Sequence, residues 1–149
     1  MEDILSLDNQ LCFALYACSK ELLRKYEPVL APLGLTYTQY IVMLALWERD
    51  VQTVKSLGDT LCLDSGTLTP LLKRMEAKGF LEKRRSARDE RLVEVLLTGK
   101  GRALREQARG IPEKMLCITG FSPEGAAALR ETLRDFLVRL REEEEPGRS

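Results

Sequence analysis

The stretch that decides the fold is DSGTLTPLLKRMEAKGFLEKRRSARDER, residues 64–91. Asp64 or Ser65 can cap a helix start there, because a short side-chain oxygen accepts a backbone N–H that has no helical partner. Gly79 can end the same helix in the left-handed conformation. Between these ends, apolar side chains recur at helical spacing: Leu68, Leu71, Leu72 and Met75. The sequence therefore predicts a short helix that buries one face and offers the other for contact.

A cationic hairpin is predicted directly after this helix. The segments 80–83 and 92–97 have the composition of two short strands, and the loop between them holds four arginines against two acids. A short polar helix followed by a cationic hairpin is the outline of a winged helix-turn-helix, whose helix enters the DNA major groove while the hairpin tip reaches the minor groove. The expected DNA-contacting residues are Ser65, Thr67, Thr69, Lys73, Arg74, Arg84, Arg85, Arg88, Asp89 and Arg91. The alternative is a solvated amphipathic helix with a charged hairpin.

The charge distribution favours the DNA-binding interpretation, although the total does not. The 149 residues carry 23 Lys+Arg and 23 Asp+Glu, so the net charge is zero. Residues 65–109 nevertheless hold twelve basic and six acidic side chains, a local excess of six positive charges. Acids elsewhere compensate, notably at 142–145.

The order of the remaining elements fits a mainly α, α+β winged helix-turn-helix fold. Helices are expected at 7–26 and 38–47, after a Thr53 cap, from Thr98 toward residue 116 with a kink at Pro112, and after Ser122. A chain of this length suits a single domain. We expect a winged helix-turn-helix at about 36–109, dimerisation helices at about 4–34 and 111–142, and a frayed tail at 143–149.

Both chain ends are predicted to be long helices with apolar stripes broad enough to pack on a partner. One winged unit covers few base pairs, whereas a two-fold dimer places two recognition helices about one DNA turn apart. A homodimer on palindromic double-stranded operator DNA is therefore expected. In the alternative arrangement, the terminal helices cover their own core.

The composition also indicates the cellular compartment and which cofactors can be expected. No run approaches membrane-spanning length, and the acidic N-terminus lacks the basic start of a signal peptide, so a cytoplasmic protein with no membrane partner is expected. There is no histidine, and the four cysteines lack paired metal-ligand spacing: Cys12, Cys18, Cys62 and Cys117. We therefore expect no metal and no cofactor.

Four segments together carry a family resemblance: LDNQLCFALYA at 7–17, GLTYTQY at 34–40, LDSGTLTPLLKRME at 63–76 and DER at 89–91. They resemble the MarR-type winged-helix transcriptional regulators, and more narrowly their organic-hydroperoxide-sensing, OhrR-like branch. The wing pattern indicates only the broad family, whereas the run NQLCF at 9–13 with the two tyrosine positions is more specific.

The resemblance implies a role for each matching residue. Cys12 would be the peroxide-sensing thiol, and Tyr26 and Tyr37 would hydrogen-bond it from the other subunit. Arg91 would be the wing arginine that enters the minor groove. Cys117 lies where some members have a second, resolving cysteine, which forms an intersubunit disulfide with the sensor.

The chemistry of such a sensor can be stated independently of the family. A thiolate, not a thiol, attacks a peroxide oxygen, and the resulting sulfenic acid condenses with a second thiol. Without histidine, the possible sources of thiolate stabilisation are the positive end of the first helix and hydrogen bonds from Tyr26 and Tyr37. Asp8 is expected to cap that helix, with Cys12 about one turn inside it. The alternative for Cys12 is a small buried hydrophobic residue.

The other cysteines and tyrosines are expected to be structural. We assign Cys18 and Cys62 to structure, and Tyr16 and Tyr40 to packing. The predicted function is a repressor that releases its operator after an organic hydroperoxide oxidises Cys12, and it is not an enzyme. Two alternatives remain open: a MarR-type regulator triggered by a small aromatic ligand, and a thiol peroxidase that uses the same cysteine.

Overall fold

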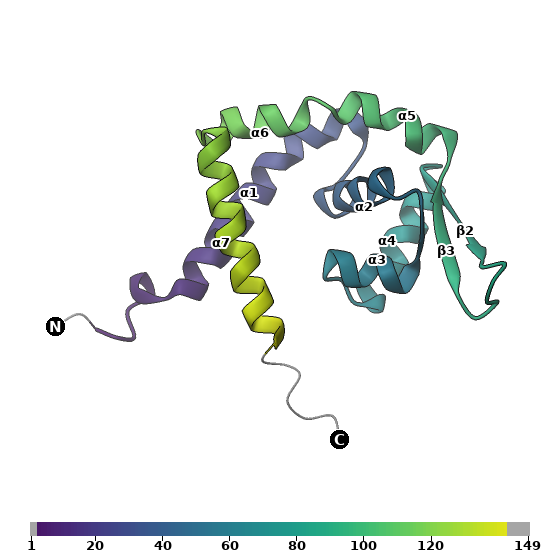
Figure 1. Ribbon diagram of the computed structural model, residues 1–149. Coiled ribbons are helices and arrows are strands. Elements are labelled where there is room, and N and C mark those ends of the chain that lie inside the picture. Colours follow the sequence, from purple (N-terminus) through teal and green to yellow (C-terminus); the bar gives the residue numbers. More distant parts are fainter. Residues whose placement is uncertain (1–2, 143–149) are drawn as a thin grey trace, which may run out of the picture. The chain divides into compact units, whose positions relative to one another are not determined.

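The computed structural model describes residues 3–142, which form two compact units. The first unit ends at Ile111 and the second begins at Pro112; the predicted tail at 143–149 lies outside the described residues. The first unit (Figure 1) contains, in order, a 3-10 turn at Leu7–Asn9, α1 (Leu11–Leu30), a 3-10 turn at Ala31–Leu33, α2 (Tyr37–Glu48), β1 (Val51–Thr53), α3 (Val54–Leu61), α4 (Ser65–Ala77), β2 (Leu81–Arg85), β3 (Val93–Leu97) and α5 (Gly99–Ala108). α6 (Ile111–Thr119) starts at the boundary and is followed in the second unit by α7 (Pro123–Glu142).

The three strands form one antiparallel sheet in the order β1-β3-β2, and this sheet with α3 and α4 completes a winged helix-turn-helix. β2 and β3 are the predicted hairpin, with Arg85 opposite Val93 at the base of its loop. β1 was not predicted; it pairs with β3 through Val51 opposite Leu96. The predicted fold class is confirmed.

The helix starts of the winged unit are capped where the sequence predicts. Thr53 Oγ1 accepts the Ser56 N–H at 3.1 Å, and Thr98 Oγ1 accepts the Gly101 N–H at 3.1 Å. Asp64 Oδ1 accepts the Thr67 N–H at 2.8 Å and so fixes the first turn of α4. Gly79 has a φ of +78° just beyond α4, in the predicted left-handed conformation.

The core of the winged unit holds α4 in a fixed orientation. The predicted apolar face of this helix is almost completely buried: Leu68, Leu71, Leu72 and Met75 are at most 3% exposed. Side chains from α2 and α3 and from the sheet complete the core: Val42, Met43, Leu46, Leu57, Leu81 and Val95. Burying one such aliphatic side chain stabilises a fold by about 1.5–3 kcal/mol, so the opposite face of α4 is presented on a rigid base.

The first helix differs from its prediction at both ends. It begins at Leu11 instead of residue 7, and Asp8 lies in the preceding 3-10 turn and does not cap it. The turn is held by the side chain of Gln10, whose Nε2 donates to the carbonyl oxygens of Ile4 at 2.9 Å and Ser6 at 3.1 Å. The helix also continues through Pro28 to Leu30, because burial of Leu30 outweighs the one backbone hydrogen bond that proline removes.

The predicted continuous helix from Thr98 to residue 116 is divided into α5 and α6. The break falls at 109–110, before Pro112 rather than at it. Pro112 is the second residue of α6, where a missing N–H costs nothing because that group has no helical acceptor. Pro112 thus helps to start a helix and does not kink one.

The second unit consists of helices with little burial in the single chain. α7 starts as predicted: Ser122 Oγ accepts the Gly125 N–H at 3.0 Å, and Pro123 is the first helical residue. No residue of α7 is buried, and its apolar stripe is exposed at Leu129, Leu133, Leu137, Val138 and Leu140.

Within the described residues, no single helix is long and apolar enough to cross a membrane. One bent pair, Leu11–Leu33 with Tyr37–Glu48 at 68°, meets the criteria of length and composition.

Candidate DNA-binding surface and thiol site

The exposed face of α4 carries the polar residues predicted to contact DNA. Ser65, Thr67 and Thr69 are exposed on its first turns, and Lys73 and Arg74 follow on the same helix. Within residues 3–142, neither Lys73 nor Arg74 makes an ion pair. Both cations are therefore available to an anionic ligand.

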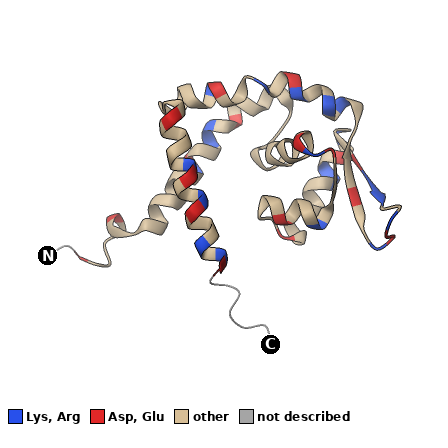
Figure 2. Ribbon diagram, viewed as in Figure 1, with Lys and Arg blue, Asp and Glu red and all other residues tan. Residues whose placement is uncertain are grey.

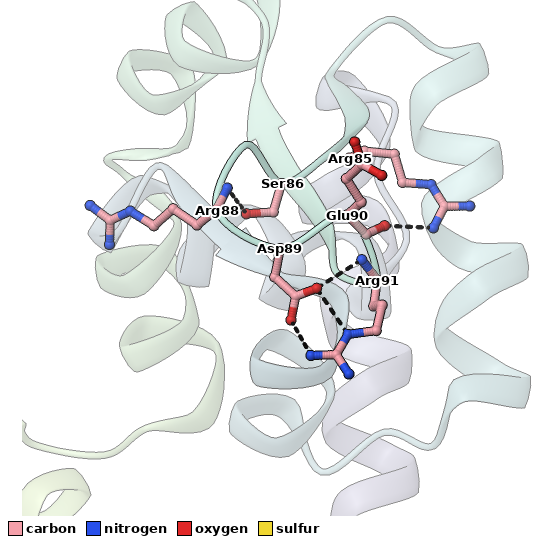
Figure 3. A network of polar contacts seen from close by, with 6 residues as sticks. All are labelled: Arg85, Ser86, Arg88, Asp89, Glu90 and Arg91. Carbon is pink, nitrogen blue, oxygen red and sulfur yellow. Dashed lines mark hydrogen bonds and ion pairs between the residues drawn. The ribbon is translucent and has the colours of Figure 1, made fainter.

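Figure 2 shows that basic residues also gather on the β2–β3 hairpin. At its tip, the Arg91 guanidinium donates from Nε to Asp89 Oδ1 and from Nη2 to Asp89 Oδ2, both at 3.0 Å (Figure 3). The Arg91 backbone N–H donates to the same carboxylate at 3.0 Å. These side-chain and backbone hydrogen bonds hold the pKa of Asp89 below its usual value. The carboxylate of Asp89 therefore orients the Arg91 guanidinium. The Arg91 side chain is nevertheless 90% exposed, so most of its surface is open to a ligand.

The other wing arginines have different partners. Arg84 Nε pairs with Glu94 Oε2 at 3.0 Å, and this hydrogen bond, with one from Ser86, lowers the pKa of Glu94. Arg85 Nη1 donates to the Glu90 carbonyl oxygen at 3.0 Å. The guanidinium of Arg88 makes no ion pair in the described part of the chain and extends away from the loop in Figure 3.

A contact that the sequence did not reveal fixes the wing relative to α4. Glu76 Oε1 accepts the Lys83 backbone N–H at 3.1 Å, and its Oε2 lies 3.7 Å from Lys83 Nζ. A hollow of about 540 Å³ opens beside this contact, between α3, α4 and β3, with three cations among its lining residues: Lys55, Lys83 and Arg91. Two acids, Asp59 and Asp64, line the same hollow, so helix and wing form one continuous charged surface.

Cys12 is the second residue of α1 and is exposed. At this position the backbone N–H groups of the first turn have no helical acceptors, and the helix dipole is positive. Cys12 is thus not buried in the single chain, and the thiol lies closer to the helix end than predicted.

The tyrosines predicted to serve the thiol lie together, but far from it along α1. The rings of Tyr26 and Tyr37 are 4.8 Å apart, and the Tyr40 ring lies 6.0 Å from Tyr26. Cys12 and Tyr26 are fourteen residues apart on one helix, which at 1.5 Å per residue is about 21 Å. No hydrogen bond between them is possible within one chain.

Burial makes these phenols harder to ionise. It raises the pKa of Tyr26 and of Tyr37 above the usual phenol value, and that of Tyr40 to about 12. A protonated phenol donates a hydrogen bond, which is what stabilisation of a thiolate requires. Tyr40 is buried, as expected for a packing residue, whereas Tyr16 is exposed and does not pack in the core.

All four cysteines are exposed on the surface of the single chain. Cys18 lies on α1, Cys62 ends α3 with a φ of +57°, and Cys117 lies on α6 in the second unit. Neither Cys18 nor Cys62 fills the core of the single chain, and Cys62 forms the C-cap of α3. The described residues contain no group of three potential metal ligands.

A capped polar helix beside a cationic hairpin defines the class of winged helix-turn-helix DNA-binding proteins. A family model described as transcriptional regulator SarA/Rot matches residues 24–107. The organic hydroperoxide resistance transcriptional regulator of Bacillus subtilis is 46% identical over 138 residues, which cover 93% of this chain and 94% of that one. Given these matches, the chain belongs to the MarR-type transcriptional regulators, in the organic-hydroperoxide-sensing branch.

Solved structures agree with this assignment. The crystal structure of AbfR of Staphylococcus epidermidis matches with a TM-score of 0.77 and 38% identity, covering 91% of this chain and 94% of that one. Mutant MarR from E. coli, complexed with operator DNA, matches with a TM-score of 0.77 and 25% identity, covering 91% and 99%. The Bacillus subtilis relative is named as a transcriptional regulator and the MarR structure holds operator DNA, so the chain is a regulator, and the thiol peroxidase alternative is set aside.

Proposed function

We propose that this chain is a homodimeric cytoplasmic repressor that releases palindromic operator DNA when an organic hydroperoxide oxidises Cys12. The observation that carries the proposal is the exposed Cys12 at the positive end of α1, in a chain 46% identical to an organic hydroperoxide resistance transcriptional regulator.

The sensing site is shared between two chains. Tyr26 lies about 21 Å from Cys12 on the same helix, so the phenols that stabilise the thiolate come from a second copy. The exposed apolar stripes of the terminal helices give that copy a surface to pack on: Leu11, Leu22 and Leu23 on α1 and Leu129, Leu133 and Leu137 on α7. Packing these stripes removes apolar area from water and drives dimerisation.

The reaction at the thiol is a two-electron oxidation. The Cys12 thiolate attacks one peroxide oxygen, the O–O bond breaks, and the departing alkoxide takes a proton to become an alcohol. The product is a sulfenic acid. The Cys117 thiol of a second copy then attacks the sulfenic sulfur, an S–S bond forms, and the hydroxyl leaves with the thiol proton as water.

The disulfide is the form that we assign to DNA release. Reduced AbfR has been solved bound to DNA, and so has overoxidized AbfR, while disulfide-formed AbfR has been solved separately. Since overoxidized AbfR has been solved with DNA, we assign release to the disulfide and not to every oxidised form of Cys12. A covalent link between α1 of one copy and α6 of another displaces the helices that carry the two winged units, and the spacing of the recognition helices is lost.

The DNA contacts divide into those that read bases and those that bind the backbone. Ser65, Thr67 and Thr69 on the first turns of α4 face the major groove, where hydroxyls can contact base edges. Lys73 and Arg74 lie further along the helix and reach phosphates. On the wing, Arg91 enters the minor groove in the orientation set by Asp89, while three further arginines surround it and attract the backbone: Arg84, Arg85 and Arg88.

The test is operator release by Cys12→Ser. The variant should bind a selected operator duplex with wild-type affinity and stay bound after one equivalent of cumene hydroperoxide, while wild type dissociates. Cys18→Ser, a change on the same exposed helix, serves as the matched control and should release normally. Peroxide-induced release by Cys12→Ser would eliminate the proposed sensor.

Intact mass under non-reducing conditions tests the second step. Wild type should form a covalent dimer with peroxide, and Cys117→Ser should remain monomeric in mass with an oxidised Cys12. A small-thiol adduct on the wild-type monomer would exclude Cys117 as the resolving thiol. Release by a phenolic acid in the absence of peroxide would favour the ligand-triggered alternative.

A further inference from the structure

An ammonium group joins the tyrosine end of α2 to the end of the recognition helix. Lys78, the residue directly after α4, donates from Nζ to the Gly34 carbonyl oxygen at 2.7 Å and to Gln39 Oε1 at 3.0 Å. These acceptors lie 44 and 39 positions earlier in the chain. Gln39 is only 3% exposed, and a hydrogen bond from a charged donor is stronger than one between neutral groups.

The same acceptor belongs to the cap of α2. Gln39 Oε1 accepts the Thr36 backbone N–H at 3.2 Å, and Thr36 Oγ1 accepts the Gln39 N–H at 3.4 Å, which is a capping box. Tyr37 is the first helical residue after Thr36, and its ring packs on Tyr26. The Lys78 ammonium is thus the third group of the cap that orients Tyr37.

On its other side, Lys78 fixes the passage from recognition helix to wing. Its carbonyl oxygen accepts Lys100 Nζ at 2.8 Å, and that ammonium lies 4.9 Å from the centroid of the Phe80 ring. Gly79 follows with a φ of +78° and turns the chain into β2. The position of Lys78 therefore determines where α4 ends and where the wing begins.

We infer that Lys78 is a positioning residue that couples the Tyr26–Tyr37 pair to the two DNA-contacting elements. The inference rests on the proposed function, because it is oxidation of Cys12 that changes the hydrogen bonding of these tyrosines. A displacement of Tyr37 moves the α2 cap, the cap moves the ammonium, and the ammonium moves the end of α4 with the root of the wing. Contact alone does not establish such coupling, so the test measures it directly.

The test compares the operator Kd of the oxidised and reduced forms in Lys78→Met, which removes the donor but keeps an unbranched, helix-favouring side chain. Cys12 should be oxidised at the wild-type rate, while the oxidised-to-reduced Kd ratio falls about tenfold, a typical size for an allosteric coupling. Lys78→Arg keeps the donors and should restore the ratio. The matched control is Lys73→Met, five residues earlier on α4, which should weaken DNA binding in both redox forms and leave the ratio unchanged.

The results for these variants can overturn the coupling role of Lys78. An unchanged ratio in Lys78→Met, or failure of Lys78→Arg to restore a lowered ratio, would overturn the coupling role. Combining Lys78→Met with Tyr37→Phe should lower the ratio no further than either change alone, and full additivity would also overturn it. If Lys78→Met does not fold, Lys78→Gln serves in the same measurement. Failure of wild type to release DNA would instead overturn the proposed repressor function and say nothing against the hydrogen bonds of Lys78.

Discussion

Replacing Arg91 by alanine should weaken operator binding strongly while leaving the fold intact. The side chain is 90% exposed and its partner is the neighbouring Asp89, so the substitution removes no core contact and leaves no buried charge unpaired. Loss of one arginine contact to DNA typically lowers affinity about 5- to 150-fold. A dimer carries two wings on one operator, so the factors multiply to about 25-fold or more.

The salt dependence of operator binding gives a second, independent measure of the Arg91 contact. Each neutralised phosphate contributes about 0.9 to the slope of log K against log salt. For one phosphate neutralised by each Arg91 guanidinium, Arg91→Ala should reduce the slope by about 1.8 for a dimer and about 0.9 for a single winged unit. Fluorescence anisotropy of a labelled operator over a series of salt concentrations measures both affinity and slope, and thermal unfolding checks the fold.

Arg109→Ala is the matched control for this experiment. Arg109 lies just after α5, is 76% exposed, and is paired with the Glu106 carboxylate at 3.5 Å. Its removal deletes the same charge outside the wing and should alter neither affinity nor slope appreciably. Equal effects of the two substitutions would show that Arg91 acts only through net charge, and unchanged binding by Arg91→Ala would refute the wing assignment.

Two further predictions concern the stability of the winged unit. A Cβ at Gly101 would lie 2.0 Å from the Phe80 carbonyl oxygen, so Gly101→Ala should lower the free energy of unfolding by about 3 kcal/mol in urea denaturation, whereas Gly99→Ala, with open space around it, should not destabilise. The pKa of Tyr40 is raised by burial to about 12 from 10.0, so the folded state keeps its proton longer than the unfolded chain. The stabilisation is complete below pH 10 and is lost as the pH rises from 10 to 12. The urea midpoint should fall over this range by less in Tyr40→Phe, and an equal fall would exclude Tyr40 as the cause.

Features governed by local chemistry could be predicted from the sequence. The cap at Asp64 and the left-handed Gly79 depend on neighbouring residues only, and both are present as expected. The prediction that Asp8 caps the first helix is wrong, because a neighbouring side chain stabilises a different local structure. The Gln10 side chain bonds the carbonyl oxygens of Ile4 and Ser6, and the resulting 3-10 turn delays the helix to Leu11.

Features that depend on distant partners could not be predicted. β1 is three residues long and has no strand-like alternation of its own; it exists because Val51 lies opposite Leu96 and the Gln52 side chain donates to the Ala45 carbonyl oxygen at 2.8 Å. The role of Lys78 is similar, because its ammonium donates to Gly34 and Gln39, which lie 44 and 39 positions away in the sequence.

The wing shows how a chain with no net charge can hold DNA. Its acidic residues do not only subtract from the positive potential, because Asp89 fixes the Arg91 fork and Glu94 fixes Arg84. An arginine held in place loses less rotamer entropy on binding, so part of the cost of ordering the interface is met before DNA arrives. The remaining attraction comes from cations without such partners in the described chain, Arg88 on the wing and Lys73 on the helix. Helix and hairpin therefore combine a fixed arginine that sets geometry with cations outside ion pairs that supply long-range attraction.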